Sequence, residues 1–423
     1  TAQISLSDTA TPTANNYGLI SYTGDGSSSL DVAFASLSSV GGTDYNATTT
    51  QIHREYAPSL VSKANNAARF ETATDGQSMG VLIESQATNL VTYSETLATG
   101  WTTHRSTLTS ASGVAPDGTL TSNLWTVDGT ASNSHNAIFD YTTGGATPQT
   151  ASVYAKAGNV NYLIMRFSPA NGAFTDGYVS FDLSNGTVGT TNGTMASSSI
   201  ESCGNGWFRC SITGTALTNA TGRLALYIAQ ADNTISFDGN SYDHIQVWGA
   251  QIEANQSFAS SYIKSNSGST TTRASDSLSI TDSSLFDTGS GSLVVEAVVK
   301  SLNDGVAAWL GTDGNNYHQV GQFGSTTYPL ISKADGVASA VLSSSAVSAG
   351  ATHKVGASWD TNDFAGCVDG GTVVTDTSGT LPAVNKLTVG NYNAAAAWLD
   401  GHVKRVAVYS EALSDTNLQA ITS

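Results

Sequence analysis

Short runs of alternating apolar and polar residues, separated by turn residues, constrain most strongly what this chain can fold into. Such runs include "SVYAKA" (residues 152–157), "YVSFDL" (178–183) and "LVVEAVV" (293–299). A period of two places successive side chains on opposite faces of a strand, so each run predicts a strand with one face toward a core. The Asn-Gly pairs in "SNG" (184–186) and "GNG" (204–206) are typical of tight hairpin turns. The pattern predicts an all-β protein.

Composition agrees with this fold class. Hydrophobic residues make up 39% of the chain, enough for real cores, while charged residues are only 12% and glycine occurs 42 times. Scarce charge and many glycines and threonines are typical of β-sheets joined by many turns. We find no internal repeat of 20–50 residues, which argues against a propeller or a solenoid. The odd number of cysteines, Cys203, Cys210 and Cys367, predicts free thiols rather than a disulfide framework.

A length of 423 residues predicts more than one domain. We expect two tandem β-sandwiches, over residues 81–265 and 280–423, joined by the polar linker "NSGSTTTRASDSLS" (266–279). Residues 1–80 are the least patterned and are expected to form an irregular N-terminal arm or attachment segment. Near the C-terminus, Ser414 is placed to cap one short helix whose apolar residues fold back onto a sheet.

The net charge of −17 limits the possible partners. Nucleic acid and anionic membranes would be repelled, and so would strongly acidic polysaccharides unless a local basic patch intervened. Neutral glycans or protein surfaces are easier partners. No apolar stretch is long enough to span a bilayer, and the first residues lack the pattern of a secretory signal, so we expect a protein made in a cytoplasm and not exported by a cleaved signal.

Several motifs recur in an order that resembles a family of tailed-bacteriophage virion proteins. They are "GVLIESQATNLVTYSE" (80–95), "SVYAKAGNVNYLIM" (152–165), "GNGWFRCSIT" (204–213) and "VWGAQIEANQSFASSYIKS" (247–265). The resemblance covers roughly residues 68–280. It implies a virion component, either a capsid fibre or decoration protein or a tail-fibre module, made in the host bacterial cytoplasm. It further implies a homotrimer that contacts other virion proteins, with the N-terminal arm gripping the particle.

The C-terminal part resembles concanavalin A-like or laminin G-like sandwiches. The resemblance is carried by "SWDTNDFAGCVDGGTVV" (358–374) and "LDGHVKRVAVYSEALSDTNLQAI" (399–421). In that fold "VDG" marks a hairpin turn, and the last strand leads into a helical turn. The resemblance implies a fold of jelly-roll or concanavalin type, and a domain that is able to bind host-surface glycans.

A catalytic alternative comes from two short motifs. "QIH", which contains Gln51 and His53, and the pair Tyr154 and Lys156 resemble the Q-I-H and Y-x-K-A-G signatures of jelly-roll alginate lyases. They would make the chain a polysaccharide lyase or depolymerase with these four residues in the site. No nucleophile elbow, P-loop or dinucleotide fingerprint occurs, and no two histidines have metal-ligand spacing. We therefore predict a non-enzymatic protein with no metal and no cofactor.

Aromatic residues beside polar loops are the other candidates for a site. Trp309, Tyr317, Tyr392 and Trp398 each lie close to loops rich in Asn, Asp or Gly. Aromatic faces stack on the C–H groups of sugar rings while neighbouring amides and carboxylates take the hydroxyls, so these four are predicted glycan contacts. Packing in a core is the alternative for the same residues. The turn 311–316, "GTDGNN", offers oxygens that are able to hold calcium.

Overall fold

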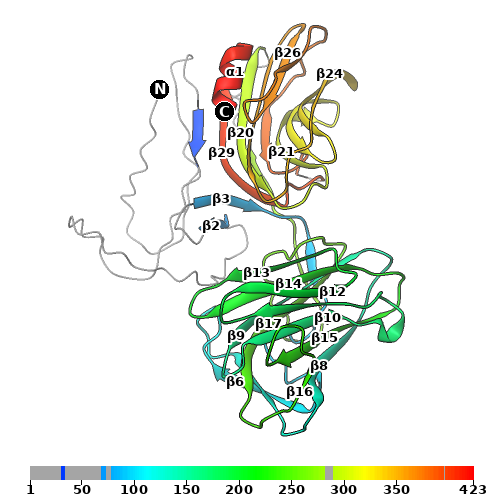
Figure 1. Cartoon of the computed structure of the whole chain (residues 1–423). Coiled ribbons are helices and arrows are strands. Elements are labelled where there is room, and N and C mark those ends of the chain that lie inside the picture. The colour runs from blue at the N-terminus through cyan, green and yellow to red at the C-terminus, as the bar shows by residue number, and fades with distance from the viewer. Residues whose placement is uncertain (1–29, 34–67, 73–77, 282–288, 395) are drawn as a thin grey trace, which may run out of the picture. The chain divides into compact units, whose positions relative to one another are not determined.

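The structure is a computed structural model that describes residues 30–33, 68–72, 78–281, 289–394 and 396–423 (Figure 1). Within those residues almost every element is a strand, with one short 3-10 helix and one α-helix. This confirms the predicted all-β class. The chain divides into two compact units, one built from residues 86–274 and the other from segments on both sides of it, and each is described by itself.

The first sandwich, residues 86–274, consists of two main antiparallel sheets. One has the order β12 (Thr187–Gly193), β11 (Gly177–Asp182), β10 (Tyr162–Phe167), β15 (Thr221–Ala229), β8 (Asn133–Thr142) and β16 (Ser236–Phe237), with β5 (Thr102–His104) also paired to β8. The other has the order β13 (Ser197–Ser202), β14 (Trp207–Thr215), β9 (Pro148–Ala157), β17 (His244–Ala254), β7 (Ser122–Val127) and β6 (Ser106–Gly113). A small ribbon joins β4 (Ala87–Asn89) to β18 (Thr271–Arg273).

Alternation in the sequence accounts for the core of this sandwich. On β9, Ala151, Val153 and Ala155 are fully buried and face the opposite sheet. Phe167 and Phe174 stack there with ring centroids 4.6 Å apart. Each fully buried aliphatic or aromatic side chain stabilises the fold by about 1.5–3 kcal/mol, so this core accounts for the stability of the unit.

The C-terminal sandwich also has two antiparallel sheets. The larger has the order β2 (Phe70–Thr72), β3 (Ser78–Ile83), β29 (Gly401–Tyr409), β20 (Gly291–Val299), β25 (Thr352–Asp360), β26 (Asp363–Val368) and β27 (Val374–Asp376), with β1 (Leu30–Ala33) also paired to β29. The smaller has the order β19 (Leu278–Ile280), β28 (Lys386–Val389), β21 (Gly305–Asp313), β22 (Asn316–Phe323), β23 (Thr327–Ala334) and β24 (Val337–Ser344).

Helix α1 (Asp415–Thr422) closes the C-terminal sandwich. The side chain of Ser414 accepts a hydrogen bond from the backbone N–H of Asn417, as an N-cap does. Leu418 is fully buried against Ala365 and Cys367 of β26. A Cβ at Gly356 would lie 2.8 Å from the Leu418 side chain, so the helix approaches β25 this closely only because that residue is glycine.

The strands before the first sandwich belong to the C-terminal sandwich. Val81 to Ile83 of β3 pair with Gly401 to Val403 of β29, and Val81 and Ile83 pack into its core. These residues fall at the boundary that the sequence placed between the arm (1–80) and the first sandwich. The expected linker, 266–279, contains β18 and the start of β19. Most of the expected arm lies outside the described residues.

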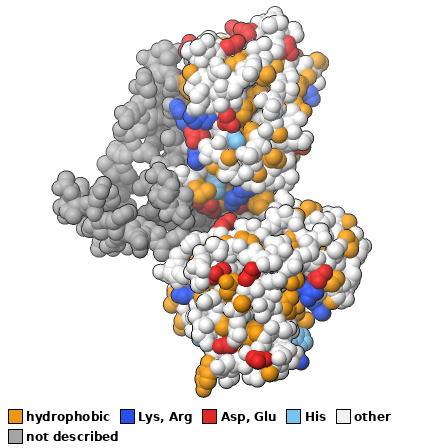
Figure 2. Space-filling view, in the orientation of Figure 1, with side chains coloured by type: hydrophobic (Ala, Val, Ile, Leu, Met, Phe, Trp, Pro, Cys, Tyr) orange, Lys and Arg blue, Asp and Glu red, His pale blue; other side chains and the backbone are white. Residues whose placement is uncertain are grey.

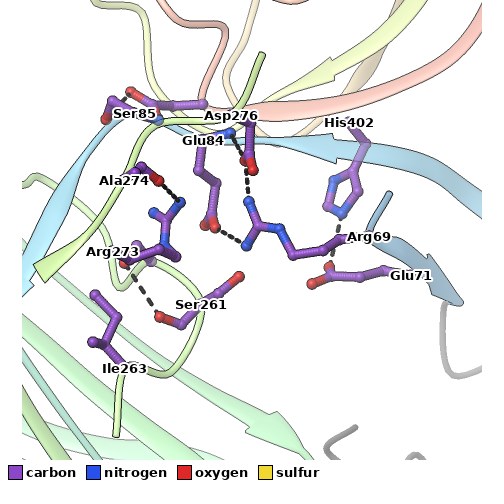
Figure 3. A network of polar contacts seen from close by, with 12 residues as sticks. Arg69, Glu71, Glu84, Ser85, Ser261, Ile263, Arg273, Ala274, Asp276 and His402 are labelled. Atoms are coloured by element: carbon purple, nitrogen blue, oxygen red, sulfur yellow. Dashed lines mark hydrogen bonds and ion pairs between the residues drawn. The ribbon is translucent and has the colours of Figure 1, made fainter. Parts of the chain in front are cut away.

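A polar network fixes β2 and β3 to this unit (Figure 3). The Arg69 guanidinium pairs with Glu84, whose carboxylate is fully buried, at 2.6 Å, and also with Asp276. On β2, Glu71 accepts a hydrogen bond of 2.7 Å from Nε2 of the buried His402. A buried carboxylate is stable only when it is paired and hydrogen-bonded, so Arg69 and Glu84 hold each other in place.

Candidate functional site

Three of the four predicted aromatic residues come together on the outer face of the smaller C-terminal sheet. On β21, Leu310 points into the core, and its neighbour Trp309 therefore points away from it. The Trp309 ring centroid lies 6.1 Å from Tyr317 of β22 and 6.0 Å from Tyr392, which follows β28. Tyr317 and Tyr392 meet edge to face at 5.4 Å. We call Trp309, Tyr317 and Tyr392 the aromatic cluster.

A lysine and an asparagine border the aromatic cluster. The Lys386 ammonium lies 5.2 Å from the centroid of the Trp309 ring, within the range of a cation–π contact. The same ammonium donates a hydrogen bond of 2.7 Å to Oδ1 of Asn393. Backbone hydrogen bonds in both directions between Tyr392 and Ala396 fold the loop back on itself and fix Tyr392 beside Trp309. These contacts place a cationic donor, Lys386, and a neutral amide, Asn393, at the edge of the aromatic surface.

Two polar atoms of this face are buried and lack a partner among the described residues. They are Nε1 of Trp309 and Oγ1 of Thr388, and both side chains are fully buried. Trp309 and Thr388 are directly opposed in the pairing of β21 with β28, so they share the outer face. An unsatisfied buried polar group costs about 1–3 kcal/mol. The fold therefore keeps two polar atoms, on opposed residues of neighbouring strands, that form no hydrogen bond within the described residues.

Tyr317 of the aromatic cluster acts as a neutral hydroxyl group. Burial, followed by the neighbouring Tyr392 and a hydrogen bond with it, raises the pKa of Tyr317 to about 12. A phenol that stays protonated both donates and accepts a hydrogen bond. The exposed turn 313–316 lies next to Tyr392, since a Cβ at Gly314 would be 3.6 Å from the Tyr392 hydroxyl. Hydroxyls and amides of this kind are suited to the hydroxyl groups of a sugar.

The carboxylate of Asp313 forms hydrogen bonds within the turn 313–316. Oδ1 of Asp313 accepts hydrogen bonds from the backbone N–H groups of Asn315 and Asn316. Oδ1 of Asn316 in turn accepts from the backbone of Asp335. Within the described residues, no three His, Cys, Asp or Glu side chains gather as metal ligands would.

Trp398 lies apart from the aromatic cluster. Its indole N–H donates a hydrogen bond of 2.8 Å to the backbone oxygen of Asp276, and its ring packs against the core of the C-terminal sandwich. Trp309 and Tyr317 are buried, while Tyr392 and Trp398 are half-buried. Of the four predicted aromatic residues, Tyr392 is therefore the one that belongs to the aromatic cluster and is also partly accessible to solvent.

The residues proposed for a lyase are only partly described. Gln51 and His53 lie outside the described residues. Tyr154 is 2% exposed on β9, where its ring meets Trp248 edge to face at 5.3 Å and lies 5.5 Å below the guanidinium carbon of Arg209. Lys156 is half-buried on the same face of the sheet. The structure thus places Tyr154 among aromatic side chains, with a cation against its ring.

Sequence reasoning missed Lys386, Thr388 and Asn393. Lys386 and Thr388 alternate with Leu387 and Val389 in "NKLTV", a signal that puts the two polar residues on the outer face. The register that opposes Thr388 to Trp309 joins strands 79 positions apart (388 − 309), and no local pattern encodes it.

Comparisons with known proteins find only distant structural likenesses. No family model matches the sequence, and no curated protein matches it. Domain 4 of a GH43 extracellular arabinanase from Geobacillus stearothermophilus, in complex with arabinotriose, is 14% identical over 35% of this chain and 73% of its own, with a TM-score of 0.29. Domains LG4-5 of the mouse laminin alpha1 chain are 12% identical over 69% of this chain and 91% of theirs, with a TM-score of 0.25.

A third similar structure is the Trypanosoma rangeli sialidase bound to the inhibitor DANA. It is 10% identical over 76% of this chain and 62% of its own, with a TM-score of 0.26. The chain thus spans less than two thirds of that sialidase. With identities of 10–14% and TM-scores below 0.3, these three likenesses support no conclusion about a shared activity, and the β-sandwich class rests on the strands and sheets of the structure itself.

The prediction that the chain is not an enzyme is contradicted by these comparisons and is withdrawn. Both the arabinanase and the sialidase are glycoside hydrolases. The prediction rested on the resemblance to virion proteins and on the lack of linear catalytic motifs, and the lack of such motifs is a weak basis in a β-sandwich. Sites on such folds are built from side chains of different strands, so their residues need not be close in sequence.

Proposed function

We propose that this chain is a virion-surface protein of a tailed bacteriophage that binds a host-surface glycan at the aromatic cluster. The observation that carries the binding proposal is the opposed pair of buried, unpartnered polar atoms, Trp309 Nε1 and Thr388 Oγ1. A ligand hydroxyl that reaches them supplies the hydrogen bonds that the protein lacks. The virion assignment is supported by the ordered motifs between residues 80 and 265.

The chemistry of the aromatic cluster favours a neutral sugar. Tyr392 offers a ring edge and a hydroxyl, and Lys386 and Asn393 offer further donors and an acceptor. The net charge of −17 disfavours a polyanionic ligand. Charged side chains are sparse on the face of each unit that Figure 2 shows. Neutral hexoses and their oligomers are therefore the class of ligand to test first.

The Thr388→Val substitution gives the sharpest test of the binding site. Valine keeps the shape of threonine but removes the unpartnered hydroxyl, so the free energy of unfolding should rise by about 1 kcal/mol. Affinity for any neutral oligosaccharide that a glycan array finds for the full chain should fall about fivefold to tenfold, which is one lost hydrogen bond. Tyr392→Ala should reduce binding further. Opposite effects on stability and binding distinguish a ligand contact from a packing position.

Thr327→Val is the matched control. Oγ1 of Thr327 is also buried without a partner among the described residues, but Thr327 pairs with Phe323, which lies in the core. It should gain stability without any change in glycan binding. Equal binding by wild type and Thr388→Val would contradict the proposal. The same samples are assayed for release of reducing sugars, which reports any glycosidase activity directly.

The virion location and the homotrimer are tested separately from binding. Imaging of phage particles labelled on this protein should show copies at the particle surface, and light scattering of the purified chain should give the mass of three chains. Residues 1–80 are expected to attach the protein to other virion proteins. Labelling absent from particles would contradict the virion assignment, and a monomer in solution and on particles would contradict the trimer.

A further inference from the structure

A second polar surface lies on the outer face of the first sandwich, on the sheet that contains β9 and β14. Residues that point away from the core alternate along both strands. In the pairing of these strands Ser152 opposes Ser211, Tyr154 opposes Arg209, and Lys156 opposes Trp207. Arg209 and Lys156 are therefore diagonal neighbours across the strands, about 7–8 Å apart at the backbone and within reach of each other's side chains.

Arg209 is held in position without a carboxylate. Its guanidinium carbon lies 5.5 Å from the centroid of the Tyr154 ring, and Nη2 donates a hydrogen bond of 3.0 Å to Ser152 Oγ. Its Nε is buried and has no partner among the described residues. Within the part of the chain that the structure describes, Arg209 forms no ion pair.

Other arginines of the same unit differ in this respect. Arg166 donates two hydrogen bonds to the carboxylate of Asp176, at 2.7 and 2.8 Å. Arg223 does the same with Asp140, again at 2.7 and 2.8 Å. The planar guanidinium group of arginine is suited to such bidentate pairing with a carboxylate. Arg209 is positioned by Tyr154 and Ser152 but lacks the carboxylate partner that these arginines have.

The carboxylates nearest to Arg209 do not replace such a partner. Glu201 opposes Arg209 in the pairing of β13 with β14, but it is exposed and forms no ion pair with it. Glu253 is buried on β17 and accepts hydrogen bonds from the backbone and the hydroxyl of Ser260. Desolvation by burial raises the pKa of the Glu253 carboxyl.

We propose that Arg209 and Lys156 bind the carboxylate of an acidic saccharide on this face of the first sandwich. Arg209 forms the two-pronged contact, and Lys156 adds a second positive charge. The hydrogen-bonded hydroxyls of Ser199 and Ser211, which are 2.8 Å apart, lie on the same face for the sugar hydroxyls. The proposal uses a different unit from the aromatic cluster and does not rest on the function proposed above.

The negative charge of the whole chain defines which acidic saccharide fits. A net charge of −17 repels a polymer with a carboxylate on every unit, whereas a single carboxylate meets only the local pair of cations. The site therefore selects glycans with isolated acidic sugars over polyuronates. Because the contact is electrostatic and half-exposed, added salt should weaken it.

The test measures binding of D-glucuronate and of D-glucose to the full chain by NMR titration at low salt. Glucuronate should bind and glucose should not. Arg209→Gln should weaken glucuronate binding about tenfold or more, the effect of losing a charge-assisted hydrogen bond. Lys156→Gln should weaken it about threefold, and Glu201→Gln should strengthen it, because each changes one nearby charge.

Two controls keep the outcome specific. Arg223→Gln removes an arginine that is already paired with Asp140 and should leave glucuronate binding unchanged. Thr388→Val should also leave it unchanged, which separates this site from the aromatic cluster. Equal binding of glucose and glucuronate, or wild-type affinity in Arg209→Gln, would overturn the proposal. If Arg209→Gln fails to fold, the opposite effects of Lys156→Gln and Glu201→Gln decide, and their absence overturns it.

Discussion

The two sandwiches differ in how the chain builds them. The first uses one continuous segment, residues 86–274, and its described strands all come from that segment. The C-terminal sandwich also takes β2 and β3, which precede the first sandwich by sequence, and pairs β3 with its last strand, β29. The C-terminal sandwich therefore needs residues from both sides of the first sandwich in the sequence to complete its larger sheet. Continuity of sequence is therefore a poor guide to which residues fold together here.

Removing the early strands should have the largest effect and should separate the two sandwiches. A fragment of residues 86–274 is expected to unfold cooperatively, whereas a fragment of residues 275–423 is expected not to fold. The second fragment loses the burial of Val81, Leu82 and Ile83, each 2% exposed, at about 1.5–3 kcal/mol per side chain. That is a large share of the 5–15 kcal/mol typical of a domain. Circular dichroism during urea titration measures both fragments.

A comparison of residues 68–423 with residues 86–423 refines this test. The longer fragment keeps β2, β3 and the Arg69–Glu84 pair, while the shorter one has none of them. Only the shorter one should lose the unfolding transition of the C-terminal sandwich. A cooperative transition in the 275–423 fragment would show that β3 is dispensable and would contradict the comparison.

Glu84→Gln should have the next largest effect, and it acts on the C-terminal sandwich alone. The Glu84 carboxylate is fully buried against Arg69, so removing its charge should cost about 3–5 kcal/mol. Asp140→Asn is the matched change in the first sandwich, where the carboxylate paired with Arg223 is 41% exposed. It should cost about 0–1 kcal/mol. Urea unfolding of the full chain gives both values, and equal costs would contradict the role of burial.

The contrast between the sandwiches also shows what the sequence could reveal. Alternation in "SVYAKA" and "LVVEAVV" was enough to predict strands and an all-β class, because burial of one face follows from local pattern. The capping of α1 by Ser414 was also readable locally. The pairing of β3 with β29 joins residues more than 300 positions apart, and such long-range register has no local signal.

The candidate site follows the same division. The polar loops beside Trp309, Tyr317 and Tyr392 are visible in the sequence, and the rings of these three residues do contact one another in the structure. The placement of Trp398 against the core depends on its hydrogen bond to Asp276, which only the folded chain brings near. Arg209 was not predicted as part of a site, because its lack of a carboxylate partner is a property of three dimensions.

The two sandwiches should lose stability over different pH ranges. His318 is buried in the C-terminal core, stacked 4.1 Å from Trp359, and burial lowers its pKa to about 3 from an ordinary 6.5. Below about pH 6.5 the unfolded chain binds a proton that the folded chain does not. Stability is thus full above that pH and falls by about 1.4 kcal/mol per pH unit toward pH 3.

In the first sandwich, the stability that Asp182 contributes should be lost only at a lower pH than the stability linked to His318 in the C-terminal sandwich. Burial opposes ionisation of Asp182, but hydrogen bonds from Ser184 and Asn185 outweigh it and lower the pKa of Asp182 to about 2 from 3.8. A lowered carboxyl pKa gives stability that is full above about pH 3.8 and is lost between there and pH 2. Urea unfolding at several pH values measures both. His318→Phe should flatten the pH dependence of the C-terminal sandwich, and an unchanged slope would contradict the assignment to His318.

Removal of the two helix caps should give the smallest difference between the sandwiches. Ser414→Ala removes the N-cap of α1, which carries the buried Leu418, and should cost about 1 kcal/mol. Ser168 caps the 3-10 helix η1 (Pro169–Asn171) of the first sandwich, which buries none of its residues, so Ser168→Ala should cost less. Thermal unfolding of the full chain compares the two. Equal losses of stability in Ser414→Ala and Ser168→Ala would show that the packing of Leu418, and not the cap, holds α1 in place. In that case Leu418→Ala should lower the free energy of unfolding by about 2–5 kcal/mol.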